Sequence, residues 1–102
     1  MQLEKGGDFM HKRHKYKTLG NKQNVTGTVI NYYRNKKEIS AQQLSDKLMM
    51  KGLDIHRQAI FAIESGLRTV ADYELFLIAE ALEVTIDELF TKFRELLKDE
   101  ID

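Results

Sequence analysis

One stretch decides the fold, and it reads Ile55-His-Arg-Gln-Ala-Ile-Phe-Ala-Ile-Glu-Ser-Gly66. Its apolar residues recur at the spacing that gives a helix one buried stripe: Ile55, Ala59, Ile60 and Ile63. Gly66 stands where a helix end needs a residue that tolerates left-handed backbone geometry. The stretch therefore predicts a helix over Ile55–Glu64 with one face in the core and the other in solvent.

The solvent face of this helix carries Arg57 and Gln58 side by side in its first turn. In a major groove a guanidinium can hydrogen-bond guanine O6 and N7, and an amide can hydrogen-bond adenine N6 and N7. We interpret the stretch as a recognition helix that the rest of the chain positions. The alternative interpretation is that Arg57 and Gln58 belong to an ordinary solvated face.

The composition limits the classes of protein to which the chain can belong. Its 102 residues predict one domain with one modest core. The chain has no Cys, which excludes disulfides, thiolate metal sites and a Cys nucleophile, and which fits a reducing compartment. No apolar run is long enough to cross a membrane, and no signal peptide is visible. We expect a soluble, cytoplasmic protein without a cofactor.

The formal net charge of zero conceals a strong asymmetry along the chain. Residues 1–24 carry six basic and two acidic residues, and residues 25–71 carry seven basic and four acidic residues. Residues 72–102 reverse the balance, with three basic and ten acidic residues. This distribution suits a protein that offers its basic part to a polyanion. The alternative is two ordinary solvated faces.

Residues 1–23 lack a sustained apolar period and are expected to form a basic N-terminal arm. The arm contains the run His11-Lys-Arg-His-Lys-Tyr-Lys17, in which Lys12 and Arg13 are candidate contacts to a DNA backbone. The alternative is a variable tail with no role in binding. His11 and His14 have a spacing that suits a metal on a helix, but no third ligand is near, so no metal site is expected.

The middle of the chain predicts two helices before the decisive stretch. Val25–Asn35 has apolar residues at helical spacing, and Val25 is placed on its core face. Ser40 and Gln43 form a capping box that opens a helix over Ala41–Lys51. Gly52 ends that helix, whose expected buried residues are Ala41, Leu44, Leu48 and Met49. Asp54 or His56 is expected to cap the helix that follows.

Two further helices are predicted after Gly66. The first covers Asp72–Leu82, and Thr85 with Glu88 forms a second capping box that opens a helix reaching Ile101. Leu89 and Phe90 are expected to pack into the domain. Three further apolar residues exceed what a small core needs, and they predict a homodimer seam: Phe93, Leu97 and Ile101. The alternative is that they lie under the N-terminal arm.

The ordered set of motifs resembles the lambda-repressor-like (Cro/repressor-type) helix-turn-helix family. The resemblance covers about residues 24–90, and it rests on Ser40-Ala-Gln-Gln-Leu-Ser45, Ile60-Phe-Ala-Ile-Glu-Ser-Gly66, Asp72-Tyr-Glu-Leu75, Ile78-Ala-Glu-Ala-Leu82 and Asp87-Glu-Leu89, with Asn24, Gly27, Ile30 and Arg34 before them. It implies an all-α fold of five helices. We place the helix-turn-helix domain at 24–92, and the end of the fifth helix with an acidic tail at 93–102.

The resemblance also implies roles for individual residues. It pairs Arg34 with Glu64, so that an ion pair ties the first helix to the recognition helix. The implied base readers are Arg57, Gln58, Phe61 and Ala62. Phe61 would touch a thymine methyl or only cover the neighbouring turn. The implied contacts to the DNA backbone are Ser40, Gln42 and Arg68, and His56 would touch a phosphate or only cap its helix.

Two positions and the length of one segment depart from the family pattern. Ala41 and Leu67 stand where relatives often have Gln and Lys, which predicts weaker phosphate contacts unless the arm compensates. The chain from Leu44 to Glu64 is also longer than in the shortest relatives, with the extra residues around Met49–Leu53. The angle between the two helices of the motif therefore cannot be taken from the family.

These features favour a sequence-specific DNA-binding transcriptional regulator whose partner is double-stranded DNA and which acts as a dimer. The alternative is a protein-interaction module, such as an antitoxin or anti-regulator, that holds a partner with its acidic last helix and tail. We expect no enzyme activity and no small-molecule substrate. The sequence shows no nucleophile–base set, no Gly-rich phosphate loop and no carboxylate–His cluster.

Overall fold

The computed structural model describes residues 22–101, with side chains as far as Lys98. These residues form five α-helices and no strand, as predicted: α2 (Gly27–Lys36), α3 (Ala41–Met50), α4 (Arg57–Glu64), α5 (Asp72–Leu82) and α6 (Ile86–Ile101). The all-α fold class is confirmed.

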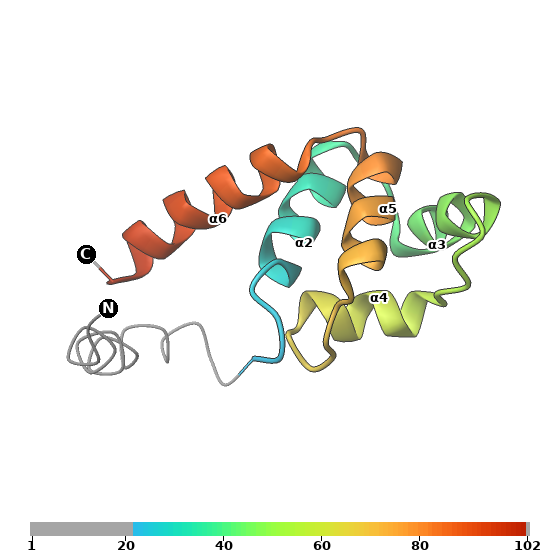
Figure 1. The fold of residues 1–102 in the computed structure, drawn as a ribbon, viewed down its shortest axis with the longest axis horizontal. Helices are drawn as coiled ribbons and strands as arrows, with labels where there is room; N and C mark the ends of the chain where they lie inside the picture. The colour runs from blue at the N-terminus through green and yellow to red at the C-terminus, as the bar shows by residue number, and fades with distance from the viewer. Residues whose placement is uncertain (1–21, 102) are drawn as a thin grey trace, which may run out of the picture.

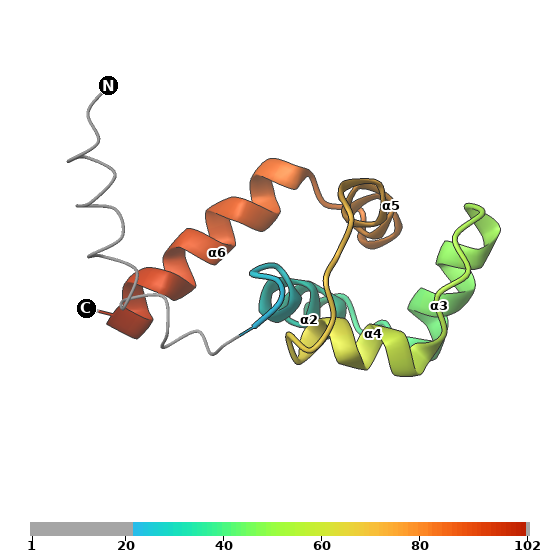
Figure 2. The same cartoon turned by 60° about the horizontal axis from the view of Figure 1, so that its bottom comes forward.

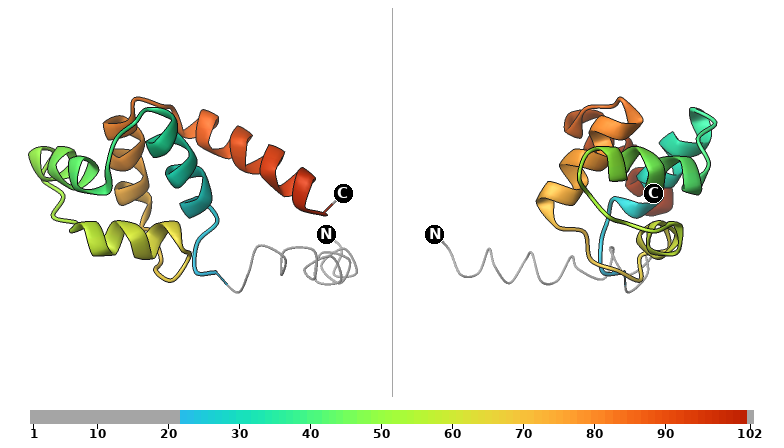
Figure 3. Two further views of the ribbon diagram at one scale, coloured as in Figure 1. Left: turned by 180° about the vertical axis from the view of Figure 1, so that it is seen from behind. Right: turned by 90° about the vertical axis from the view of Figure 1, so that its right-hand side faces the viewer.

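The helices divide into a compact part and one that projects from it. Helices α3 and α4 contact each other. Helix α5 packs against α3, α2 packs against α4, and α2 and α5 contact each other (Figure 1). Helix α6 contacts α2 and α5, and its far end points away from α3 (Figures 2 and 3). The described part is accordingly elongated, with dimensions of 47 × 25 × 23 Å. The arrangement leaves the outer side of α4 uncovered.

The predicted helix boundaries were wrong at two N-termini. Helix α2 begins at Gly27 and not at Val25, because the Asn24 side chain accepts a hydrogen bond from Gly27 N–H (2.6 Å). Val25 precedes the helix and is 45% exposed. Helix α4 begins at Arg57, since Ile55 reaches the core from an extended segment and its carbonyl accepts the Ser45 hydroxyl (2.6 Å).

The predicted capping boxes are confirmed. Ser40 Oγ accepts from Gln43 N–H (3.0 Å), and the Gln43 amide oxygen accepts from Ser40 N–H (2.8 Å). Thr85 and Glu88 exchange the equivalent bonds at 2.9 and 2.7 Å. At the other end of α3, Gly52 has a φ of +87°, a conformation that glycine adopts without strain. Short-range polar signals therefore set the ends of α3 and the start of α6.

One core joins all five helices. Nine side chains are fully buried in it: Val29, Ile30, Leu44, Leu48, Ile60, Ile63, Ile78, Leu82 and Leu89. Met49, which was predicted to be buried, is 50% exposed, because its neighbour Leu48 occupies the core side of α3. Phe93 is partly buried and packs against this core. Leu97 is half-buried outside this cluster.

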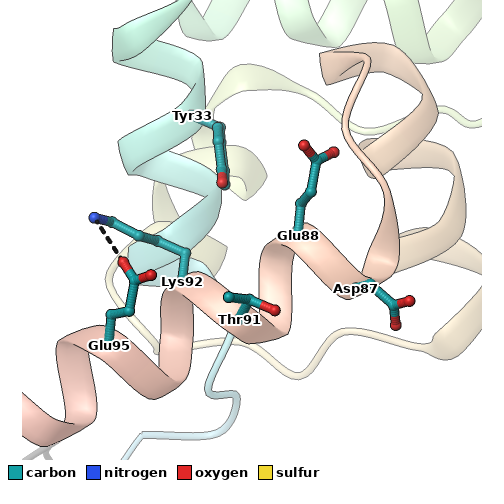
Figure 4. A pocket seen from close by; sticks show the side chains of 6 residues that line it. All are labelled: Tyr33, Asp87, Glu88, Thr91, Lys92 and Glu95. Carbon is teal, nitrogen blue, oxygen red and sulfur yellow. Dashed lines mark hydrogen bonds and ion pairs between the residues drawn. The ribbon is translucent and has the colours of Figure 1, made fainter.

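Helix α6 is held against α2 by an aromatic and charged contact. Figure 4 shows Tyr33 of α2 facing α6 residues that include Lys92 and Glu95, around an open pocket of about 190 Å³. Lys92 Nζ lies 4.3 Å from the centre of the Tyr32 ring and 3.4 Å from Glu95 Oε1. The lysine thus combines a cation–π contact with an exposed ion pair.

Among the described residues, no helix has the length and apolar character needed to cross a membrane.

Candidate nucleic-acid interface

Helix α4 turns one side to the core and the other to solvent. Ile60 and Ile63 are each 1% exposed and anchor the inner side. On the outer side Arg57 and Gln58 are exposed, Phe61 is 49% exposed, and Ala62 is half-buried. Helical neighbours lie three or four positions apart, so the four predicted base readers share one surface. The structure brings them together, with the guanidinium and amide at the N-terminal end and the apolar pair one turn later.

The start of α4 is open. His56 occupies the N-cap position, yet its side chain makes no capping hydrogen bond. Its imidazole lies 3.8 Å from the Asp54 carboxylate, and both side chains are largely exposed. Because the first N–H groups of a helix have no partner within it, this end presents backbone donors and a positive dipole end outward. Such an end favours an anion such as a phosphate.

The start of α3 carries two more of the predicted contacts to a DNA backbone. Ser40 and Gln42 are both exposed. The Ser40 hydroxyl oxygen is engaged in its capping box, and Gln42 Nε2 donates to Asp46 Oδ1 at 3.0 Å. Two donors therefore remain for a phosphate: the Ser40 hydroxyl hydrogen and the second hydrogen of the Gln42 side-chain amide.

Arg34 and Glu64 form a buried bidentate ion pair between α2 and α4. Arg34 Nε lies 2.7 Å from Glu64 Oε2, and Nη2 lies 3.0 Å from Oε1. Arg34 also donates to the Ile39 carbonyl, and Asn31 donates to Glu64. Hydrogen bonding to Glu64 raises the pKa of Arg34 against the opposing effect of burial. The pair fixes the end of α4 on α2, and charge-assisted forks of this kind set geometry strictly.

Phe61 leans toward this ion pair. Its ring centre lies 6.0 Å from the guanidinium carbon of Arg34. That distance is at the outer limit of a cation–π contact. One side of the ring therefore covers the buried pair while the other remains in solvent, which is compatible with both roles considered for this residue.

Asn24 closes the C-terminal end of α4, a role that the sequence did not suggest. Its Nδ2 donates to the carbonyls of Ile63 (3.0 Å) and Arg68 (2.7 Å). The first bond gives a second donor to a carbonyl in the last turn of α4, which also accepts from Gly66 N–H (3.0 Å), and the second bond holds the loop that follows the helix. Gly27 approaches so closely that a Cβ there would overlap the Ile63 carbonyl oxygen. Gln23, the residue before Asn24, donates its N–H to the Gly66 carbonyl (2.7 Å). The segment that leads into α2 thus lies beside the C-terminal end of α4.

Arg68 has a partner within the chain that the sequence also failed to reveal. Its Nη1 and Nη2 lie 3.0 and 2.9 Å from the two carboxylate oxygens of Glu74, and Nη1 also donates to the Thr69 carbonyl. Glu74 additionally accepts from Ala71 N–H at the start of α5 (3.0 Å). Hydrogen bonding to Arg68 is the main cause that lowers the pKa of Glu74, and the same bonds raise the pKa of Arg68.

Acid is expected to remove the stability that the Arg68–Glu74 pair supplies. The pKa of Glu74 lies below its ordinary value of 4.5. Its contribution is therefore complete above that value and is lost as the pH falls through the lower pKa of the folded protein. A Glu74→Gln variant cannot titrate there, so its free energy of unfolding should fall less across this acid range. Urea unfolding at several pH values measures the difference, and parallel losses in the two proteins would contradict it.

The remaining predicted site residues lie outside the part of the chain that the structure describes. Lys12 and Arg13, like His11 and His14, fall outside the residues that the structure describes. The side chain of Ile101 is also outside the description. Between residues 22 and 98 no group of His, Asp and Glu side chains is arranged to hold a metal ion.

The sequence matches one protein-family model over most of the described helices. A family model described as helix-turn-helix, of the Cro/C1 type, matches residues 30–89, which include all of α3, α4 and α5. Members of that family are typically non-enzymatic DNA-binding domains. Comparisons with curated proteins and with solved structures gave no match.

Proposed function

The chain belongs to the Cro/C1-type helix-turn-helix family, and we propose on this basis that it is a transcriptional regulator that recognises specific duplex DNA sequences with α4. In this class of protein the second helix of the motif lies in the major groove and its N-terminal residues contact base edges. The observation that carries the proposal is the uncovered outer side of α4, which is fixed to α2 by the Arg34–Glu64 pair.

The side chains on that surface have complementary chemistry for base recognition. We assign Arg57 to guanine O6 and N7, and Gln58 to adenine N6 and N7. Phe61 and Ala62 offer apolar contact to a thymine methyl group. All four belong to a helix of eight residues, so they would read a short half-site.

Contacts to the sugar–phosphate backbone would set the register of α4 in the groove. We assign this role to six side chains, four in the described part of the chain and two in the arm: Ser40, Gln42, His56, Arg68, Lys12 and Arg13. The open N-terminus of α4 adds backbone donors. The acidic side chains of Asp87, Glu88 and Glu95 would keep α6 away from DNA, so the charge asymmetry supports the same orientation.

The salt dependence of binding tests the proposal and the role of the arm. Affinity of the full chain for duplex DNA should fall steeply with salt, because each neutralised phosphate releases condensed counterions. Deletion of residues 1–21 spares the Gln23–Gly66 hydrogen bond and should leave the thermal unfolding temperature unchanged. The shortened chain should bind more weakly, with a slope of log K against log salt shallower by about 0.9 for each phosphate that the arm neutralises. An unchanged slope would remove the arm from the mechanism.

We also propose that two copies bind together through the projecting part of α6. Phe93 is partly taken up by the domain core, so the seam would depend on Leu97, with Ile101 one turn further on. A dimer would place two recognition helices on half-sites about 34 Å apart. Leu97→Lys should halve the mass measured by sedimentation equilibrium, whereas Lys98→Ala beside it should not. A monomeric parent chain that still binds one operator would contradict the dimer.

If the chain does not bind duplex DNA, the second candidate function is a protein-interaction module. Large apolar side chains are exposed away from α4, among them Met50 (89%), Tyr73 (59%) and Phe76 (54%). A folded chain with no affinity for duplex DNA at low salt, together with a stable complex with another protein, would favour that function.

A further inference from the structure

We infer that Glu74 is a positioning residue for DNA binding, which holds the Arg68 guanidinium in the orientation that contacts a phosphate beside the recognition helix. The inference rests on the proposed function. It assigns to an acidic residue a favourable role in binding a polyanion.

The Arg68 head group is fixed but not consumed by its partners. A guanidinium has five N–H donors. The Glu74 carboxylate and the Thr69 carbonyl take three of them, which leaves the Nε hydrogen and one Nη2 hydrogen for another acceptor. The Arg68 side chain is 32% exposed, whereas the Glu74 side chain is 10% exposed. The pair is therefore turned with its arginine outward and its carboxylate inward.

The other end of Arg68 is fixed as well. Its backbone carbonyl accepts the 2.7 Å hydrogen bond from Asn24, and the loop that carries it begins at the C-terminal end of α4. Glu74 is itself held by Ala71 N–H in the first turn of α5. The backbone of Arg68 is thus tied to Asn24 just before α2, and its guanidinium is tied to the start of α5. An acceptor that meets the guanidinium in this position need not immobilise a long, freely rotating side chain.

Two physical effects of Glu74 on DNA binding have opposite signs. Its negative charge lies near the DNA and on simple electrostatic grounds should weaken binding, so its removal should strengthen binding. Its hold on Arg68 should strengthen binding, so its removal should weaken it. A neutral substitution therefore shows which effect dominates.

The experiment compares three variants of the full chain on the DNA sequence that the parent chain binds best. Arg68→Ala should weaken binding and make the slope of log K against log salt shallower by about 0.9, which corresponds to one phosphate. Glu74→Gln should weaken binding by about 2- to 10-fold, the range that ordering one long side chain costs. Asp72→Asn is the matched control, because it removes the same charge from an exposed position in the same turn of α5. It should leave binding unchanged or slightly tighter.

Other results would overturn the inference. Binding by Glu74→Gln as tight as by Asp72→Asn would mean that Glu74 acts only through its charge. An unchanged salt slope in Arg68→Ala would show that Arg68 does not contact a phosphate. In that case, loss of base preference in variants of Arg57 would still support recognition of DNA by α4. No DNA binding by the parent chain would overturn the proposed function itself.

Folding of the variants is controlled separately. Circular dichroism melts establish that each variant is folded at the temperature of the binding assay. If Glu74→Gln does not fold, Arg68→Lys decides the question, because lysine keeps the charge but lacks the planar fork that matches a carboxylate. Weaker binding by Arg68→Lys at an unchanged unfolding temperature supports the inference, and parental binding overturns it.

Discussion

Replacement of Arg57 and Gln58 by alanine is expected to abolish base preference while general affinity for duplex DNA persists. A well-formed bidentate contact contributes about 1–3 kcal/mol of discrimination between bases. Removal of both bidentate side chains should therefore reduce specific affinity by about 30-fold or more, since 1.4 kcal/mol corresponds to a factor of ten. Contacts to phosphates do not depend on these two side chains, so binding to unrelated DNA should change much less.

Competition between the preferred sequence and unrelated DNA measures this change in specificity. Arg94→Ala is a suitable control, because it removes one positive charge from an exposed position on α6, away from the recognition surface. The control should retain the ratio between specific and unrelated DNA. A double variant at Arg57 and Gln58 that also retains this ratio would show that bases are read elsewhere.

The second large effect is expected at the Arg34–Glu64 pair. Arg34 is only 8% exposed, and Glu64→Ala would leave its guanidinium buried with the Ile39 carbonyl as its remaining partner. Removal of one partner from a buried ion pair typically costs about 3–5 kcal/mol. Replacement of both residues by apolar side chains of similar size avoids the uncompensated charge. The double variant Arg34→Met/Glu64→Leu should therefore be more stable than Glu64→Ala alone.

Urea unfolding of the single and double variants tests this order. The exposed Lys92–Glu95 pair provides the comparison, since Glu95→Ala should change stability by less than about 1 kcal/mol. Equal losses of stability in Glu64→Ala and in the double variant would show that the buried charge is not the cause. The same experiment separates stability from recognition, because a folded double variant can be assayed for DNA binding.

Most of the fold could be predicted because its signals are local. Ser40 with Gln43 and Thr85 with Glu88 lie three residues apart, so each cap can be identified in a short window of sequence. Gly52 marks its helix end in the same way. The errors arose where a distant contact decides a boundary. Asn24 accepts from Gly27 N–H at the start of α2, but its position is fixed by bonds to carbonyls 39 and 44 positions away, so Val25 lies before the helix that it was predicted to begin.

The candidate site was predicted less completely for the same reason. The surface of α4 follows from helical spacing, and the Arg34–Glu64 pair came from the family resemblance, since no local pattern joins residues 30 positions apart. The Arg68–Glu74 pair spans a loop and the start of α5, where sequence spacing does not fix side-chain geometry. Met49 illustrates the complementary error, because an apolar residue near a helix end need not face the core.

Sequencing of genomic DNA fragments captured by the purified full chain at moderate salt is the most direct test of the central claim. A sequence-specific regulator should enrich fragments that share one motif, and a dimer would repeat the motif at a spacing of about one helical turn. The enrichment should disappear with Arg57→Ala/Gln58→Ala. A well-folded chain that enriches no motif would contradict recognition of DNA by α4.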